Sequence, residues 1–96
     1  SENSNENKKE LKIEVLNGTG KSSNLTKVTK ILKQNGYNVI KTGNTNNTTK
    51  TQIINRTNQS SKTTKELKEI LEVGTTSEKS NNSNVDYTII LGKDYE

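Results

Sequence analysis

The stretch Gly18–Ser22 places two glycines, a lysine and a serine directly after an apolar run, which are the residue types of a phosphate-binding loop. The nucleotide-binding P-loop needs a further glycine five positions before its Gly-Lys-Ser. That position holds Val15, a branched residue typical of a strand. The dinucleotide-binding fingerprint fails as well, because Ser23 stands where its third glycine belongs. We therefore expect no nucleotide site.

Two other interpretations of this stretch remain. Asn17, Gly18, Thr19 and Gly20 can form a tight strand-to-helix turn, in which glycines adopt conformations that other residues avoid. Alternatively, the N–H groups at the helix start, helped by Lys21, can hold a phosphate or carboxylate. The structural interpretation is the commoner one, and these five residues are kept as candidate anion-binding residues.

The rest of the chain offers little catalytic chemistry. There is no cysteine and no histidine, which excludes disulfides, thiolate nucleophiles, the usual zinc sites and histidine-based catalysis. Glu66, Glu69 and Glu72 lie beside lysines, as on a solvated helix face, with Lys65–Glu69 and Lys68–Glu72 spaced as i,i+4 pairs. Asp94 follows Gly92, where a turn or backbone hydrogen bond is favoured over ligand binding. We expect no catalytic residue, no metal and no cofactor, and retain Asp94 as a candidate binding residue.

The charge balance is basic, with a formal net charge of +4. Lys27, Lys30 and Lys33 recur every three residues beside the glycine turn, and the first two are candidate contacts for an anionic polymer. Nucleic acid is the weaker option for the same electrostatics, because the three tyrosines do not alternate with basic residues.

Size and composition predict one small, thinly packed domain. Of 96 residues, 24% are hydrophobic and the mean hydropathy is −1.04, yet the Leu, Ile, Val and Tyr residues fall into short clusters. Residues 1–10 are expected to be a polar linker or a trimmed end, and residues 11–96 the domain. No apolar run approaches the ~18 residues needed to span a membrane, so an anchor would have to lie upstream of Ser1.

The apolar periodicities predict four strands and two helices. Ser22 or Ser23 is expected to cap the first helix, and Gly36 to end it. The link at residues 43–49 is short enough for a hairpin between the second and third strands. In chain order we expect a strand around Leu11–Val15, a helix around Leu25–Leu32, strands at Tyr37–Thr42 and Lys50–Asn55, a helix at Ser61–Val73, a loop at Gly74–Asn84 and a strand at Val85–Leu91.

The order βαββαβ predicts the fold class. Alternation of apolar and polar residues in the first and last strands argues against a sheet covered on both faces. Right-handed crossovers then place both helices on one face. We therefore expect an α+β, two-layer open-faced sandwich of ferredoxin-like type. Leu16 and Ile90 should point to the uncovered face, where Ile40 or Ile54 joins them.

Both ends of the chain resemble one family. Val15–Gly20, the following helix and Gly36–Val39 look like the start of the LytR C-terminal domain family. The closing strand with Leu91-Gly92-Lys93-Asp94-Tyr95 resembles the Leu-Gly-x-Asp-Tyr/Phe signature at the family's end. The likeness covers about Lys12 to Tyr95, and Ser23-Asn24 departs from the usual Gly-Leu pair.

The resemblance implies a non-enzymatic accessory domain of a LytR-CpsA-Psr cell-envelope protein. Its expected place is the outer face of a Gram-positive-type envelope, anchored to the membrane in the full-length protein. Its expected partner is an anionic cell-wall polymer such as teichoic acid, peptidoglycan, or a wall-synthesis protein. The alternative is a structural or oligomerisation module that acts through the open sheet face, with weak nucleic-acid binding as a remote third.

Overall fold

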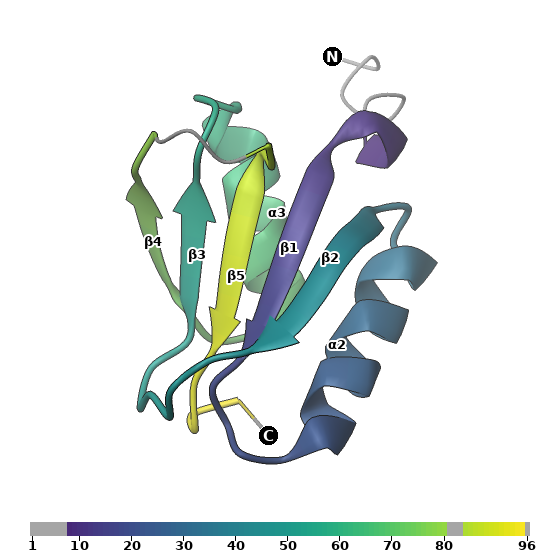
Figure 1. Ribbon diagram of the computed structural model, residues 1–96. Coiled ribbons are helices and arrows are strands. Elements are labelled where there is room, and N and C mark those ends of the chain that lie inside the picture. Colours follow the sequence, from purple (N-terminus) through teal and green to yellow (C-terminus); the bar gives the residue numbers. More distant parts are fainter. Residues whose placement is uncertain (1–7, 81–83, 96) are drawn as a thin grey trace.

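The computed structural model describes residues 8–80 and 84–95, which form a five-stranded sheet with two helices on one face (Figure 1). Residues 1–7 of the expected linker lie outside the described residues. The elements are η1 (Lys8–Glu10), β1 (Lys12–Asn17), α2 (Ser22–Gln34), β2 (Asn38–Asn44), β3 (Gln52–Asn55), α3 (Ser61–Leu71), β4 (Thr75–Glu78) and β5 (Tyr87–Leu91).

The sheet has the strand order β2-β1-β5-β3-β4. Strand β1 pairs in parallel with β2 through α2, and β3 pairs in parallel with β4 through α3, so the chain contains two βαβ halves. The last strand, β5, lies between the halves, parallel to β1 and antiparallel to β3. The α+β, ferredoxin-like open-faced sandwich is thus confirmed, and its βαββαβ order is supplemented by one short strand, β4.

Two local predictions were wrong. The segment 74–84 was expected to be a loop, but Thr75–Glu78 forms β4, because backbone pairing with β3 needs no apolar side chain. The link at residues 43–49 does not make a hairpin, since β2 and β3 are separated by β1 and β5. A polar four-residue edge strand has no hydrophobic periodicity that a sequence pattern could detect.

The core lies between the sheet and the helices, as the alternation predicted. In β1 and β5 the odd-numbered residues are fully buried, while Leu16 and Ile90 on the other face are only partly buried. The buried apolar cluster is formed by Leu11, Ile13, Val15, Val28, Leu32, Tyr37, Ile53, Leu67, Leu71, Tyr87, Ile89, Leu91 and Tyr95. Both helices contribute two residues to it, which fixes them against the same face.

The helix ends follow local capping rules with two corrections. Helix α2 begins after Lys21, which caps it without a side-chain bond, so neither Ser22 nor Ser23 is the N-cap. Gly36, at φ +92°, follows the C-cap Asn35 as predicted. Helix α3 ends at Leu71 instead of Val73, because Glu72 already adopts the left-handed conformation.

Candidate functional site

The Asn17–Gly20 turn is braced by its own side chains. The Asn17 amide donates to the Lys21 carbonyl at 2.9 Å, and its Oδ1 accepts from the Thr19 N–H at 3.0 Å and from the Thr19 hydroxyl at 2.7 Å. Thr19 Oγ1 in turn accepts from the Lys21 N–H and from the Asn24 amide, each at 3.1 Å. Asn24, which departs from the family pattern, is therefore used to support the turn.

Both glycines of the turn are required by geometry. Gly20 has φ +84°. At Gly18 a Cβ would lie 2.8 Å from the Leu91 carbonyl oxygen and 2.8 Å from Thr48 Cγ2. The Gly18 N–H also donates to that Leu91 oxygen at 2.8 Å. An anion would need the N–H groups of Gly18, Thr19 and Lys21, and all three already donate within the protein. This favours the structural interpretation of the turn.

The other candidate residues are divided between two places. Asp94 Oδ1 accepts from the Thr51 N–H at 2.9 Å and from its hydroxyl at 2.7 Å, which fixes the chain just before β3. Lys27 lies with its Nζ 5.5 Å from the centroid of the Tyr95 ring. Lys27 and Asp94 line one hollow of about 290 Å³ between the helices and the C-terminal segment. Exposed Lys30 and the turn residues line none of the three cavities described here.

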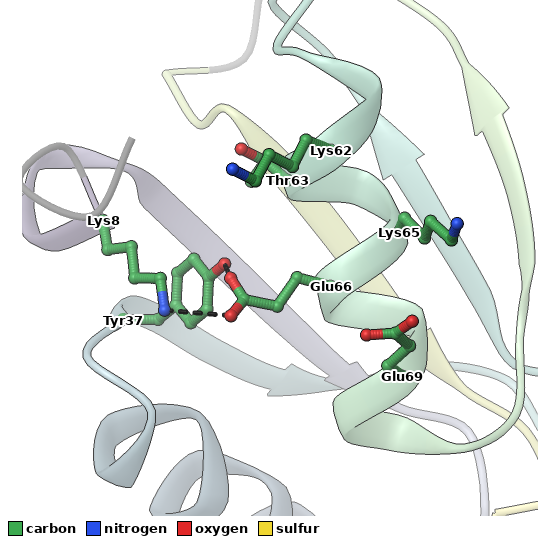
Figure 2. Close-up of a pocket in the computed structure, with 7 residues that line it drawn as sticks. All are labelled: Lys8, Tyr37, Lys62, Thr63, Lys65, Glu66 and Glu69. Atoms are coloured by element: carbon green, nitrogen blue, oxygen red, sulfur yellow. Dashed lines mark hydrogen bonds and ion pairs between the residues drawn. The ribbon is translucent and has the colours of Figure 1, made fainter. Parts of the chain in front are cut away.

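A second pocket, of about 270 Å³, has the buried Tyr37 in its wall (Figure 2). The Tyr37 hydroxyl donates to Glu66 Oε1, and Lys8 Nζ lies 3.0 Å from Glu66 Oε2. The same Lys8 ammonium is 5.1 Å from the Tyr37 ring centroid and donates to the Asn35 carbonyl at 3.3 Å. This Lys8–Tyr37–Glu66 cluster joins η1, the start of β2 and α3. Sequence reasoning missed it, since its members are far apart in the chain.

The protonation states of this cluster are fixed. Burial, and then the hydrogen bond to the Glu66 carboxylate, raise the pKa of Tyr37. For Glu66, partial burial acts to raise the pKa, but the hydrogen bonds from Tyr37 and Lys8 outweigh it and lower the pKa. At neutral pH the tyrosine is therefore protonated and the glutamate ionised. Neither pKa is moved toward neutrality, as proton transfer at neutral pH would require, and the cluster is built as a structural tie.

The third and largest hollow lies between α3 and β4 and measures about 630 Å³. Three lysines of α3 line it together with hydroxyl-bearing residues and one glutamate. The lining residues are Ser61, Lys62, Thr64, Lys65, Lys68, Thr76, Ser77 and Glu78. The predicted pairs Lys65–Glu69 and Lys68–Glu72 are not ion pairs, and in the second case Glu72 lies beyond the end of the helix. This hollow was not predicted from the sequence, because the segment that contains β4 was expected to be a loop.

The open sheet face carries a row of paired polar groups. Glu14 accepts from the Thr88 hydroxyl at 3.1 Å and lies 3.6 Å from Lys41 Nζ, and Arg56 Nε donates to the same Thr88 oxygen at 3.1 Å. Leu16 and Ile90 are register partners on this face. The apolar residue that joins the open surface is Ile40, 54% exposed beside the bulge in β2, while Ile54 is only 6% exposed.

Among residues 8–80 and 84–95, no group of three or more His, Cys, Asp or Glu side chains is placed to hold a metal ion. No helix in this part of the chain has the length and apolar character needed to cross a membrane.

Comparison with known proteins gave one match. The model of the LytR_C family, described as LytR cell envelope-related transcriptional attenuator, matches residues 10–95. Neither the curated proteins nor the solved structures yielded a match. The family match covers nearly the whole chain, including the Asn17–Gly20 turn and the Leu91–Tyr95 ending that carry the resemblance.

Proposed function

Because the chain belongs to the LytR_C family, whose members are accessory domains of cell-envelope LytR-CpsA-Psr proteins, we propose that it binds an anionic cell-wall polymer without catalysing a reaction. In this proposal the domain works on the extracellular side of the envelope of a Gram-positive-type cell. The polymer is of the teichoic-acid kind that is attached to peptidoglycan. An upstream anchor would hold the domain at the membrane.

One observation carries the proposal: the net charge is concentrated on the helix layer. Helices α2 and α3 together contain six lysines and two glutamates, so their excess equals the +4 of the whole chain. Among the described residues the ion pairs Lys8–Glu66 and Lys41–Glu14 do not involve the α3 lysines Lys62, Lys65 and Lys68. A layer with an excess of lysines attracts a polyanion, whereas on the open sheet face Glu14 is paired with Lys41.

The site geometry supports binding in preference to catalysis. The Lys8–Tyr37–Glu66 cluster holds its protons firmly, and at the glycine turn the N–H groups of Gly18, Thr19 and Lys21 donate within the protein. The remaining features are exposed lysines and hydroxyls, which contact a charged polymer and do not activate a nucleophile.

Sedimentation with purified cell walls tests the proposal. The protein should co-sediment with walls that keep their anionic polymers and be released as salt is raised. Walls stripped of those polymers should retain several-fold less protein. Equal retention on intact and stripped walls would move the partner to peptidoglycan itself, and no retention on either would overturn the proposal.

The second candidate function is an oligomerisation module. It is supported by the adjacent, partly exposed Leu16 and Ile90 on the open sheet face. Sedimentation velocity over a concentration series decides it: a dimer that Leu16→Asp abolishes would support this function, and a monomer at every concentration would exclude it.

A further inference from the structure

The hollow between α3 and β4 has a polar wall, because β4 has no apolar side chain. In the first half of the sheet, Val39 of β2 is the register partner of the buried Ile13 and packs against the core beside α2. In the second half, the register partner of the buried Ile53 is Thr76. All four residues of β4 are exposed, and the wall that they give the hollow is polar and open to water.

The helix side of this hollow is a row of cations. Lys62, Lys65 and Lys68 are spaced i, i+3, i+6, and with a rise of ~1.5 Å per residue successive lysines are ~4.5 Å apart along the helix axis. Across residues 8–80 and 84–95 none of the three forms an ion pair. In Figure 2 the Lys65 side chain points away from the Tyr37–Glu66 pair, toward the other flank of α3.

The facing wall, β4, offers two hydroxyl groups and one carboxylate. Thr76 and Ser77 of β4 and Ser61 of α3 supply hydroxyls, and Glu78 is the one carboxylate in the lining. There is no arginine in this lining, so the planar, two-pronged binding typical of carboxylates is not provided. Point-charge ammonium groups with hydroxyl donors suit the tetrahedral oxygens of a phosphate.

The α2 lysines share the spacing but not the surroundings. Lys27 lies over the Tyr95 ring in a hollow that also contains Glu72 and Asp94. Lys30 and Lys33 line none of the three cavities. The row on α2 therefore has no second wall to enclose a ligand, whereas the row on α3 has β4.

We propose that the hollow between α3 and β4 is the polymer-binding site, and that it takes a linear chain of repeating phosphodiesters. The lysines of α3 contact successive phosphates, and the hydroxyls of Ser61, Thr76 and Ser77 donate to their oxygens. The inference rests on the proposed function and specifies its site and ligand class.

Two matched triple variants test the location. The α3 variant Lys62→Gln, Lys65→Gln, Lys68→Gln and the α2 variant Lys27→Gln, Lys30→Gln, Lys33→Gln remove the same charge at the same spacing. The probe is fluorescently labelled poly(glycerol phosphate), titrated with the 96-residue protein at several salt concentrations. The α3 variant should bind at least tenfold more weakly and show a shallower salt dependence. The α2 variant should stay within about threefold, as long-range charge alone dictates.

Two further variants and a carboxylate probe test separately the hydroxyl group, the opposing charge and the ligand class. Thr76→Val replaces the hydroxyl with a methyl group at constant charge and nearly constant volume and should weaken binding about threefold, while Glu78→Gln removes the opposing carboxylate and should strengthen it. Poly-glutamate of equal length, the carboxylate probe, should bind at least fivefold more weakly than the phosphodiester. Thermal melts of each variant check that it remains folded.

The outcomes distinguish the two proposals. If the unmodified protein ignores poly(glycerol phosphate) at low salt, both the proposed function and this site are overturned. If it binds and the α2 variant loses as much affinity as the α3 variant, the site alone is overturned. Equal binding of poly-glutamate would reject the phosphodiester as the preferred ligand.

Discussion

The two βαβ halves of the sheet are built alike and differ in their outer strands. Each half pairs two parallel strands through one helix, and each helix carries three lysines at the same spacing. In the first half the outer strand supplies Val39, and in the second it supplies Thr76 at the equivalent register position. The two lysine rows therefore differ in the strand beside them: β2 packs its apolar Val39 against the core, whereas β4 forms the polar wall of the hollow that the α3 lysines border.

The largest effect is expected at the junction between the halves, where there is no free space. At Gly92 a Cβ would lie 2.4 Å from the Lys50 carbonyl carbon and 2.6 Å from the Lys50 nitrogen, both backbone atoms. Gly92→Ala should therefore lower the free energy of unfolding by about 3 kcal/mol or more. Urea denaturation measures it. Gly43→Ala is the control, since its Cβ meets only Leu16 Cδ2 at 3.4 Å, and should change stability by at most about 0.5 kcal/mol. Equal losses would contradict the close junction.

The Lys8–Tyr37–Glu66 cluster joins the first half to the helix of the second. Tyr37→Phe removes the donor to Glu66 and should cost about 1 to 1.5 kcal/mol, below the usual value for a charged acceptor because Glu66 is partly exposed and keeps Lys8. Thermal and urea unfolding provide the measurement. An unchanged stability would show that the two halves are held together by the apolar core alone.

The same cluster should make stability depend on pH. The pKa of Glu66 is lower in the folded protein than its ordinary value, so its contribution is present above the ordinary carboxyl pKa of ~4.3 and is lost as pH falls below it. Glu66→Gln should cost about 0.5 kcal/mol at pH 7, and the difference from the parent should shrink as pH falls below the ordinary carboxyl pKa. A constant difference across that range would rule out the ionised Glu66 as the cause.

Exchanging the outer-strand residues tests the comparison directly. Val39→Thr places a hydroxyl at a partly buried apolar position and should cost about 0.5 to 1 kcal/mol. Thr76→Val should leave the free energy of unfolding within about 0.5 kcal/mol, because Thr76 is exposed and valine has nearly the volume of threonine. Thermal melts of the two single variants suffice. If both substitutions destabilise equally, the halves are packed alike and the contrast between them is wrong.

The smallest effect is expected at Lys21. Its side chain is exposed and its backbone N–H is bound by Thr19, so Lys21→Ala should leave the free energy of unfolding within about 0.5 kcal/mol. Binding of poly(glycerol phosphate) should stay within twofold. A larger loss of affinity with a shallower salt dependence would restore the Asn17–Gly20 turn as the anion site.

The sequence predicted the fold well where side chains alternate. Ile13, Val15, Tyr87 and Ile89 are buried on the face that the period-two pattern assigned to the core. The pattern could not reveal β4, whose residues Thr75–Glu78 pair only through their backbone. The order of the strands in the sheet could not be predicted from the sequence either, because it depends on which strands pair with each other in the folded protein.

The candidate site was predictable only in its residue types. Asn17–Gly20 was recognised as a turn, and the structure gives the reasons in the φ of Gly20 and the close approach at Gly18. The two lysine rows look equivalent in the sequence. Only the position of β4 beside α3 distinguishes them, and contacts such as Tyr37–Glu66 join positions 29 residues apart that no local spacing connects.

The central position of β5 has a consequence for how the chain reaches its native state. The strand that bridges the two halves comes last in the order of the elements, and it pairs with both β1 and β3. During synthesis or export each βαβ half can begin to form locally, but their inner edges stay unpaired until residues 87–91 have emerged. Folding should therefore be slow and dominated by contacts between distant residues. A nascent chain interrupted before β5 would expose two strand edges at once and be a ready substrate for proteases and chaperones.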